Sequence, residues 1–194
     1  MIDATTGNVV TTINLGGRPE TGQADTALGR VFVNLEDKNA IAVIDTATHK
    51  VVATWPIAPG EEPTGLAIDL AMHHLFAGAG GFMVMVDAKT GKVLSQVPIG
   101  DGADATWFDP GTKLALTSVR SGTVTVARED GDKLTPVQTI QTAFGSRTMT
   151  LDPATHKIYL GAAQYEPLPP NAAPNARPQA KPDSFHVLVY GMAK

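Results

Sequence analysis

The sequence predicts an all-β protein built as a β-propeller, in which four-stranded antiparallel sheets (blades) are arranged around a central channel. Two observations predict this fold. Short apolar and β-branched runs alternate with turn residues along the whole chain, and no long segment has the roughly 3.6-residue period of an amphipathic helix. The same landmarks also recur at intervals close to 42 residues, and a four-stranded unit of this length is typical of a propeller blade.

Two landmarks define the repeat. The first is an apolar residue followed by an acid at the start of a turn, which occurs at Ile2-Asp3, Ile44-Asp45 and Val86-Asp87 and degenerates to Arg128-Glu129, in steps of 42 residues. The second is an aspartate that opens a turn before a β-like run, at Asp25, Asp69, Asp109 and Asp152. Because both landmarks keep step through four copies, we expect one structural unit to be repeated along the chain.

Each unit is predicted to contain four strands, A to D, separated by turns. In the second unit these strands fall at residues 64–69, 74–78, 82–87 and 92–99. The runs FMVMVD and NAIAVID are apolar without strict alternation, which favours sheets that are covered on both faces. The WD40 type of blade is disfavoured because the chain contains neither a Gly-His nor a Trp-Asp dipeptide.

The strand inventory predicts one domain over residues 1–194, with four blades at 17–57, 58–99, 100–141 and 142–194. Residues 1–16 read as the end of a C strand followed by a D strand, whereas the last unit supplies only strands A to C. We therefore expect residues 1–16 to complete the last blade and close the ring, which leaves no open sheet edge. A monomeric ring is favoured, and a homodimer that forms a larger ring is the alternative.

One segment interrupts the repeat. Residues 164–183 contain six prolines in twenty residues and replace a short B-to-C hairpin. Polyproline II structure with little buried surface is the expectation, which predicts a mobile loop. The alternative is that this proline-rich loop is a docking peptide.

Composition excludes several classes of function. The 194-residue chain has no cysteine, which excludes disulfides, thiolate metal sites and cysteine nucleophiles. Fifteen basic and nineteen acidic residues give a net charge of −4, which argues against a nucleic-acid partner. The apolar runs are too short for a membrane span, and the N-terminus as written lacks the basic and apolar regions of a signal peptide.

The candidate binding residues lie on the connections that would surround the channel mouth. Alignment on the turn aspartates places four residues five positions upstream of them, at Glu20, Thr64, Asp104 and Arg147, and the neighbouring connections add Arg18, Glu61, Glu62 and Asp101. Clustered carboxylates attract a cation, and such oxygen ligands would suit calcium or magnesium rather than zinc. A charged, solvated rim without a metal or other cofactor is the favoured interpretation, and the cation site is the alternative.

Other residues are interpreted as structural. The five histidines read as exposed turn residues or as lacking a partner, and the aromatic residues Trp55, Trp107 and Phe108 read as packing between blades. Nothing in their spacing predicts a catalytic triad, and no glycine-rich loop leads from a strand into a helix to hold phosphate.

The residues resemble a known family. The hairpins of the form Val-Ile-Asp-x-x-Thr-Gly-x-Val-Val and the segment Val31-Phe32-Val33-Asn34 resemble YVTN/YncE-like β-propeller repeats. So does the glycine-to-proline approach to strand A, which is Gly-x-x-Pro at residues 60–63 and Gly-Arg-Pro at residues 17–19. The segments EEPTGLAID, IGDGADATWFDPGT and SRTMTLDPATHKIYL are similar to the C-terminal four repeats of a seven-bladed member. The resemblance implies a bacterial protein that is periplasmic or secreted. Relatives tend to carry cysteines near Gly60 and Ala79, where this chain has none.

Taken with the fold, these features predict a non-enzymatic binding or scaffold protein that holds a ligand or a protein at the channel mouth or rim. The alternative is a metal-dependent lactonase-like hydrolase that uses the acidic central funnel. Neither interpretation involves a nucleic acid or a membrane span.

Overall fold

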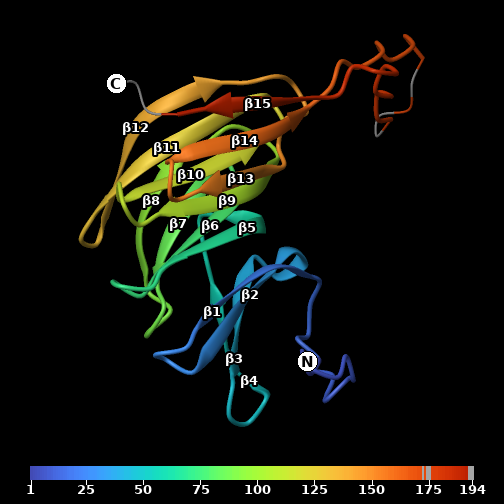
Figure 1. Ribbon diagram of the computed structural model, residues 1–194. Helices are drawn as coiled ribbons and strands as arrows, with labels where there is room; N and C mark the ends of the chain where they lie inside the picture. Colours follow the sequence, from blue (N-terminus) through green and yellow to red (C-terminus); the bar gives the residue numbers. More distant parts are fainter. Residues whose placement is uncertain (172, 174–175, 192–194) are drawn as a thin grey trace.

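The computed structural model describes residues 1–171, 173 and 176–191, which form four antiparallel sheets (Figure 1). The first sheet consists of β1 (Pro19–Asp25), β2 (Arg30–Leu35), β3 (Ala40–Asp45) and β4 (Lys50–Pro56), with a short 3-10 helix, η1 (Glu36–Lys38), before β3. The second consists of β5 (Glu61–Asp69), β6 (His74–Gly80), β7 (Phe82–Asp87) and β8 (Val93–Pro98). The third consists of β9 (Ala103–Asp109), β10 (Leu114–Val119), β11 (Thr123–Asp130) and β12 (Lys133–Gln141), and the fourth of β13 (Met149–Asp152), β14 (Lys157–Ala162) and β15 (His186–Tyr190).

The all-β class and the repeated antiparallel sheets of the sequence prediction are confirmed, because each sheet follows chain order from strand to strand. The register shows one difference in the repeat. Arg30 pairs with Asp45 and His74 pairs with Asp87, but Leu114 pairs with Arg128. Arg128, rather than Glu129, therefore occupies the position that Asp45 and Asp87 hold in the first two sheets. The third interval of the apolar–acid landmark is thus one residue shorter than predicted.

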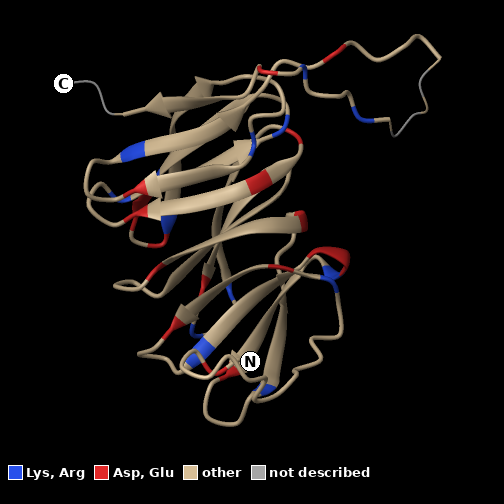
Figure 2. Cartoon of the chain, turned by 45° about the vertical axis from the view of Figure 1, so that its right-hand side comes forward, with Lys and Arg blue, Asp and Glu red and all other residues tan. Residues whose placement is uncertain are grey.

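The sheets lie face to face in an arc, with the first and fourth sheets at its two ends (Figure 1). The first strands of consecutive sheets are neighbours, because β1 packs beside β5, β5 beside β9, and β9 beside β13. Acidic and basic residues are spread over the whole arc (Figure 2). No helix in the part of the chain described by the structure is long and apolar enough to cross a bilayer.

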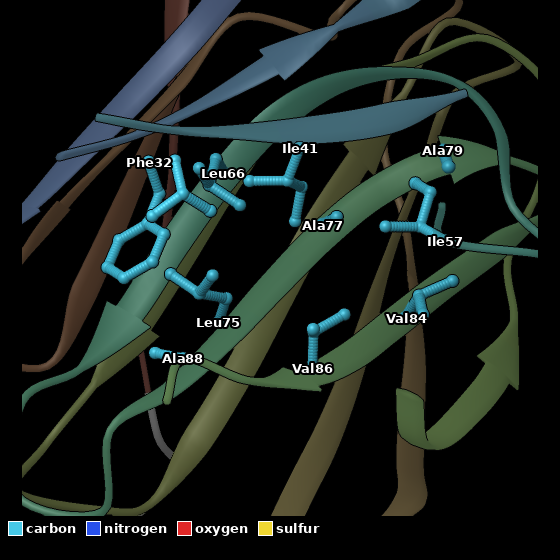
Figure 3. Packing of buried hydrophobic residues seen from close by; sticks show 11 residues of the cluster. Phe32, Ile41, Ile57, Leu66, Leu75, Ala77, Ala79, Val84, Val86 and Ala88 are labelled. Atoms are coloured by element: carbon cyan, nitrogen blue, oxygen red, sulfur yellow. The ribbon is translucent and has the colours of Figure 1, made fainter. Parts of the chain in front are cut away.

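The hydrophobic core lies between adjacent sheets. Phe32 and Ile41 of the first sheet pack against Leu66, Leu75 and Val86 of the second, and all five side chains are buried (Figure 3). The second sheet is covered on both faces by its neighbours, which accounts for the non-alternating run in β7. In the first sheet the side chains of β3 are also almost all buried.

The second interface between sheets has an aromatic centre. Phe76 of β6 stacks on Phe108 of β9 with ring centroids 4.9 Å apart and an interplanar angle of 10°. Leu116, Met149 and Leu160 contribute to the third core, between the third and fourth sheets. Burial of these side chains provides most of the stabilising free energy of such an array.

Closure of the ring within one chain, as the sequence predicted, is not found. Among the described residues β15 pairs only with β14, and the only bridge in residues 1–16 joins Ile2 to Val9. The N-terminus lies beside the first sheet, at the opposite end of the arc from β15 (Figure 1).

The N-terminal segment folds on itself because it carries its own turn. The Asp3 carboxylate accepts hydrogen bonds from the backbone N–H groups of Thr5 and Thr6 at 2.9 and 2.7 Å. The Ile2–Val9 bridge has the same spacing as the Ile44–Val51 and Val86–Val93 pairs that join strands C and D in the first and second sheets. Residues 2–9 thus have the turn that joins strands C and D in the repeat, whereas residues 10–16 form no strand.

The proline-rich loop has a defined stem. Glu166 N–H donates to the Gln179 carbonyl and Lys181 N–H donates to the Gln164 carbonyl, each at 2.8 Å, and Tyr165 bridges to Ala180. These bonds fold the two arms of residues 164–183 against each other as a hairpin that projects from one end of the arc (Figure 1).

Candidate functional site

A cleft of about 290 Å³ lies along the first strands of consecutive sheets, and we call it the first-strand cleft. Its lining comes from β1, β5, β9 and β13 and comprises Glu20, Thr21, Gln23, Thr64, Leu66, Asp104, Ala105, Thr106, Trp107 and Met149. The lining thus combines carboxylates, hydroxyls, an amide and an indole ring.

Side-chain hydrogen bonds join the strands that line the cleft. The Gln23 amide donates to the Leu66 carbonyl at 2.7 Å, and the Thr64 hydroxyl donates to the Ala103 carbonyl at 2.8 Å. The Trp107 indole N–H donates to the Met149 carbonyl, also at 2.8 Å. Each bond connects one sheet to the next, so the walls of the cleft are held in fixed relative positions.

The cleft has an acidic side. Burial raises the pKa of Glu20 above its ordinary value, and the nearby carboxylates of Glu36 and Asp104 add to this effect. The Asp104 carboxylate lies 3.4 Å from the Arg147 guanidinium and accepts a hydrogen bond from the Thr148 hydroxyl at 3.2 Å. Glu20 and Asp104 therefore sit close enough to repel each other, and only Asp104 is paired with an arginine.

The structure brings some of the predicted mouth residues together and separates others. Glu20, Thr64 and Asp104 line the cleft, and Arg147 joins them through its ion pair with Asp104.

The remaining four predicted residues lie outside the lining of the cleft. Arg18 pairs with Glu36 at 2.7 Å, and the Glu62 backbone N–H donates to the Asn39 side chain. Glu61 pairs with Gly80 at the start of β5, and Asp101 lies in the connection before β9.

Sequence reasoning missed Trp107, which was interpreted as a packing residue. Phe108 is buried as predicted, but Trp107 is 38% exposed and lines the cleft. Alignment on the turn aspartates places Trp107 at the position of Gln23, Ala67 and Thr150, and two of these three residues are polar. That polarity was the available signal that the position faces away from the core.

The predicted cation site has no ligand set in the described part of the chain. No group of three or more His, Cys, Asp or Glu side chains there is arranged to hold a metal ion. A calcium ion held by Glu20 and Asp104 would need backbone carbonyls or water to complete the six to eight oxygen ligands that calcium takes.

Three of the turn aspartates pair with the next sheet, and we call these contacts the inter-sheet pairs. Asp25 lies 2.5 Å from His73, Asp69 lies 2.8 Å from Lys113, and Asp109 lies 2.7 Å from His156. The partner residue has a positive φ in each case, at 57°, 58° and 55°. His73 and His156 are therefore not the unengaged turn residues that the sequence analysis predicted.

The middle inter-sheet pair belongs to a larger buried cluster. His74 Nδ1 lies 2.7 Å from Glu129 Oε1, and both side chains are nearly inaccessible to solvent. Lys113 Nζ lies 2.8 Å from Asp69 Oδ2 and 4.0 Å from the second Glu129 oxygen, so it stands between the two carboxyl groups. Four ionisable side chains thus meet between the second and third sheets.

The two carboxyl groups of this cluster shift in opposite directions. Burial raises the pKa of Glu129, and the adjacent Asp69 carboxylate raises it further. Burial also acts to raise the pKa of Asp69, but hydrogen bonds from the Lys113 ammonium group and the Ala71 N–H outweigh it and lower that pKa. Glu129 is thus the carboxyl group that holds the proton more strongly.

Comparison with known proteins gives similarity at the level of the fold. No family model matches the chain, and no curated protein sequence matches it. A solved structure of Kuenenia stuttgartiensis hydrazine synthase is similar, with a TM-score of 0.67 and 16% sequence identity over 81% of this chain. The match spans 45% of the hydrazine synthase chain, and at this identity it concerns the arrangement of strands alone.

Proposed function

We propose that this protein is a non-enzymatic binding module that holds a positively charged ligand in the first-strand cleft. The observation that carries the proposal is the joint presence of Glu20, Asp104 and the partly exposed Trp107 in one cleft whose walls are fixed by hydrogen bonds between sheets. Carboxylates attract a cation, and an indole ring stabilises an organic cation placed over its face.

The lining also supports recognition of an organic ligand rather than a bare metal ion. Thr21 supplies a further hydroxyl for hydrogen bonding, and Ala105 and the Trp107 ring supply apolar surface. Sites for small molecules commonly combine an apolar lining with a few placed polar groups. The metal-dependent lactonase-like hydrolase, the alternative drawn from the sequence, gains no ligand set from the described residues.

The proposal is tested by titrating the protein with choline and spermidine, in parallel with calcium and magnesium chloride, while Trp107 fluorescence is followed in a Trp55→Phe background. Choline or spermidine should bind, and Glu20→Gln with Asp104→Asn should weaken binding. Glu166→Gln, at an exposed position on the proline-rich loop, is the matched control. Calcium or magnesium binding that depends on Glu20 and Asp104 would favour the metal site instead, and no response to any cation would contradict the proposal.

We also propose that the four sheets are blades of a propeller of the YVTN/YncE-like type. Support comes from the repeated turns, since Asp3, Asp45 and Asp87 each accept hydrogen bonds from the backbone N–H groups of the second and third residues after them. The packing of consecutive first strands beside one another is the further support. A bacterial origin and a periplasmic or secreted location follow from this resemblance alone and belong to the same proposal.

Closure of such a ring by a second copy of the chain fits the open arc better than closure by the same chain. The outer edge of β15 carries exposed Val187 and Val189, and the N-terminal segment carries exposed Val9 and Val10. Apolar edge strands of this kind pair readily with another chain.

Light scattering tests this homodimer directly. A solution mass near twice 20.3 kDa, lost when residues 1–16 are deleted, is the expected result. A monomer at every concentration would contradict closure by a second copy.

A further inference from the structure

A second pocket, of about 170 Å³, collects positive charge beside the proline-rich loop. Its lining contains Arg120, Arg147 and Arg177 together with Phe144, Gly145, Tyr165 and Pro178. These are three of the six arginines in a chain whose net charge is −4, so positive charge is concentrated here against the overall balance. We call this the arginine pocket.

Three separate parts of the chain supply the arginines, and backbone hydrogen bonds fix their positions. Arg120 follows β10, and its carbonyl accepts a hydrogen bond from the Gly145 N–H at 2.9 Å. Arg147 stands two residues before β13. Arg177 lies just before the return arm of the proline-rich hairpin, whose Gln179 carbonyl bonds to the opposite arm.

The aromatic side of the pocket depends on a glycine. Gly145 has a φ of 79°, and a Cβ atom at this position would lie 2.8 Å from the Tyr165 ring. The Tyr165 ring therefore packs directly on the Gly145 backbone, and it meets the Phe144 ring edge to face with centroids 6.0 Å apart. This contact places the hairpin, and with it Arg177, over the connection that carries Arg147.

The positive charge of the pocket is only partly balanced. Arg147 lies 3.4 Å from Asp104, but within the described residues no carboxylate approaches Arg120 or Arg177 to ion-pair distance. The connection from 142 to 148 also contains the Ser146 hydroxyl, which is buried and has no partner among the described residues. Like charges that share a pocket repel, and a bound anion would relieve this repulsion.

We propose that the arginine pocket binds the oxyanion group, phosphate or carboxylate, of a small ligand whose apolar part contacts Tyr165 and Phe144. A guanidinium donates two parallel hydrogen bonds to such a group, which makes arginine the side chain best suited to recognise it. This site has no lining residue in common with the first-strand cleft, and the Arg147–Asp104 ion pair is where the two adjoin.

Calorimetric titration with inorganic phosphate, phenyl phosphate and phenylacetate at low salt tests the proposal on the full chain. Phenyl phosphate or phenylacetate should bind more tightly than inorganic phosphate, because each adds an aromatic group. Of the two, the tighter ligand identifies whether phosphate or carboxylate is the preferred group. Arg120→Gln and Arg177→Gln should each weaken binding by roughly tenfold or more, since each removes a charge-assisted hydrogen bond.

Arg128→Gln is the matched control, because Arg128 lies on the same sheet as Arg120 but outside the pocket, where its guanidinium donates to the Thr112 carbonyl. The control should bind as the parent does, and Trp107→Phe in the first-strand cleft should also leave anion binding unchanged. Absence of binding by all three anions, or equal binding by the parent and both arginine variants, would overturn the proposal.

Discussion

The ammonium group of Lys113, in the third sheet, lies 2.8 Å from Oδ2 of Asp69, in the second sheet. The Asp69 side chain is only 2% exposed, so this contact supplies a positive charge to a carboxylate that is almost entirely removed from water. The Asp25–His73 and Asp109–His156 contacts repeat the arrangement at the two neighbouring interfaces. The inter-sheet pairs therefore connect all four sheets in sequence.

The Lys113→Met variant should be less stable than the parent. Methionine keeps the apolar stem but leaves the buried Asp69 carboxylate without its ammonium partner, so the free energy of unfolding should fall by about 1–3 kcal/mol. Urea unfolding at neutral pH measures the difference. Lys89→Met, at an exposed turn position, is the control and should leave the free energy of unfolding nearly unchanged. Equal stability of Lys113→Met and the parent would contradict a stabilising role for the inter-sheet pairs.

The Glu129→Gln variant should change the pH dependence of stability. The folded-state pKa of Glu129 is raised, so the folded protein is stabilised by the protonated Glu129 side chain. This contribution to the free energy of unfolding is fully present below the ordinary pKa of 4.5 and is lost as the pH rises through the folded-state pKa. Glutamine cannot ionise, so the variant should gain stability relative to the parent as the pH rises above 4.5. Urea unfolding across this range measures it, with Glu166→Gln as control. If the free energy of unfolding differs between the variant and the parent by the same amount at every pH, Glu129 has no raised pKa.

The Gly78→Ala variant should disturb the contact between the second and third sheets. A Cβ atom at Gly78 would press on the Thr106 hydroxyl and lie 2.9 Å from Thr117 Cγ2, and such overpacking costs about 1–3 kcal/mol. Adding Thr106→Ala should recover part of the loss, and a double-mutant cycle measures the coupling. Gly161→Ala meets only an ordinary contact at 3.4 Å and should be nearly neutral. If the effects of Gly78→Ala and Thr106→Ala on the free energy of unfolding are additive, the contact between the new Cβ atom and Thr106 is not the cause of the destabilisation.

Trp107 should report the electrostatics of the first-strand cleft. In a Trp55→Phe background its fluorescence should be quenched by the cation caesium more than by the anion iodide, because Glu20 and Asp104 line the same cleft. Stern–Volmer titrations measure this ratio. Asp104→Asn should reduce the preference for caesium, whereas Asp132→Asn, remote from the cleft, should not. A preference for iodide in the parent would show that Arg147 dominates the local field.

Much of the fold could be predicted from sequence because its signals are local. The turn aspartates Asp25, Asp69 and Asp109 each bind backbone N–H groups within their own turns, so they recur at fixed spacing and mark the end of every first strand. The apolar runs of β3 and β7 likewise reflect burial on both faces.

The rest could not be predicted because it depends on how the sheets meet. His73 and His156 resemble ordinary turn residues, and their partners Asp25 and Asp109 lie 48 and 47 positions away in the chain. Only the stacking of adjacent sheets brings these side chains together. Trp107 sits next to the buried Phe108, so its exposure depends on which face of β9 borders the cleft.

The arginine pocket was beyond sequence reasoning for a similar reason. Arg120 and Arg177 are 57 positions apart. The proline-rich segment showed no periodicity that could have predicted the hairpin joining its two arms.

The serial order of the sheets has a consequence for how the molecule comes apart. Each sheet is stabilised by contacts with its immediate neighbours, so the array behaves as a row of coupled units in which the two middle members are held from both sides. Opening fluctuations should therefore begin at the outer members and spread inward. Amide protons of β6 and β10 would then exchange more slowly than those of β3 and β14, although all four are central strands with the same hydrogen-bonding pattern.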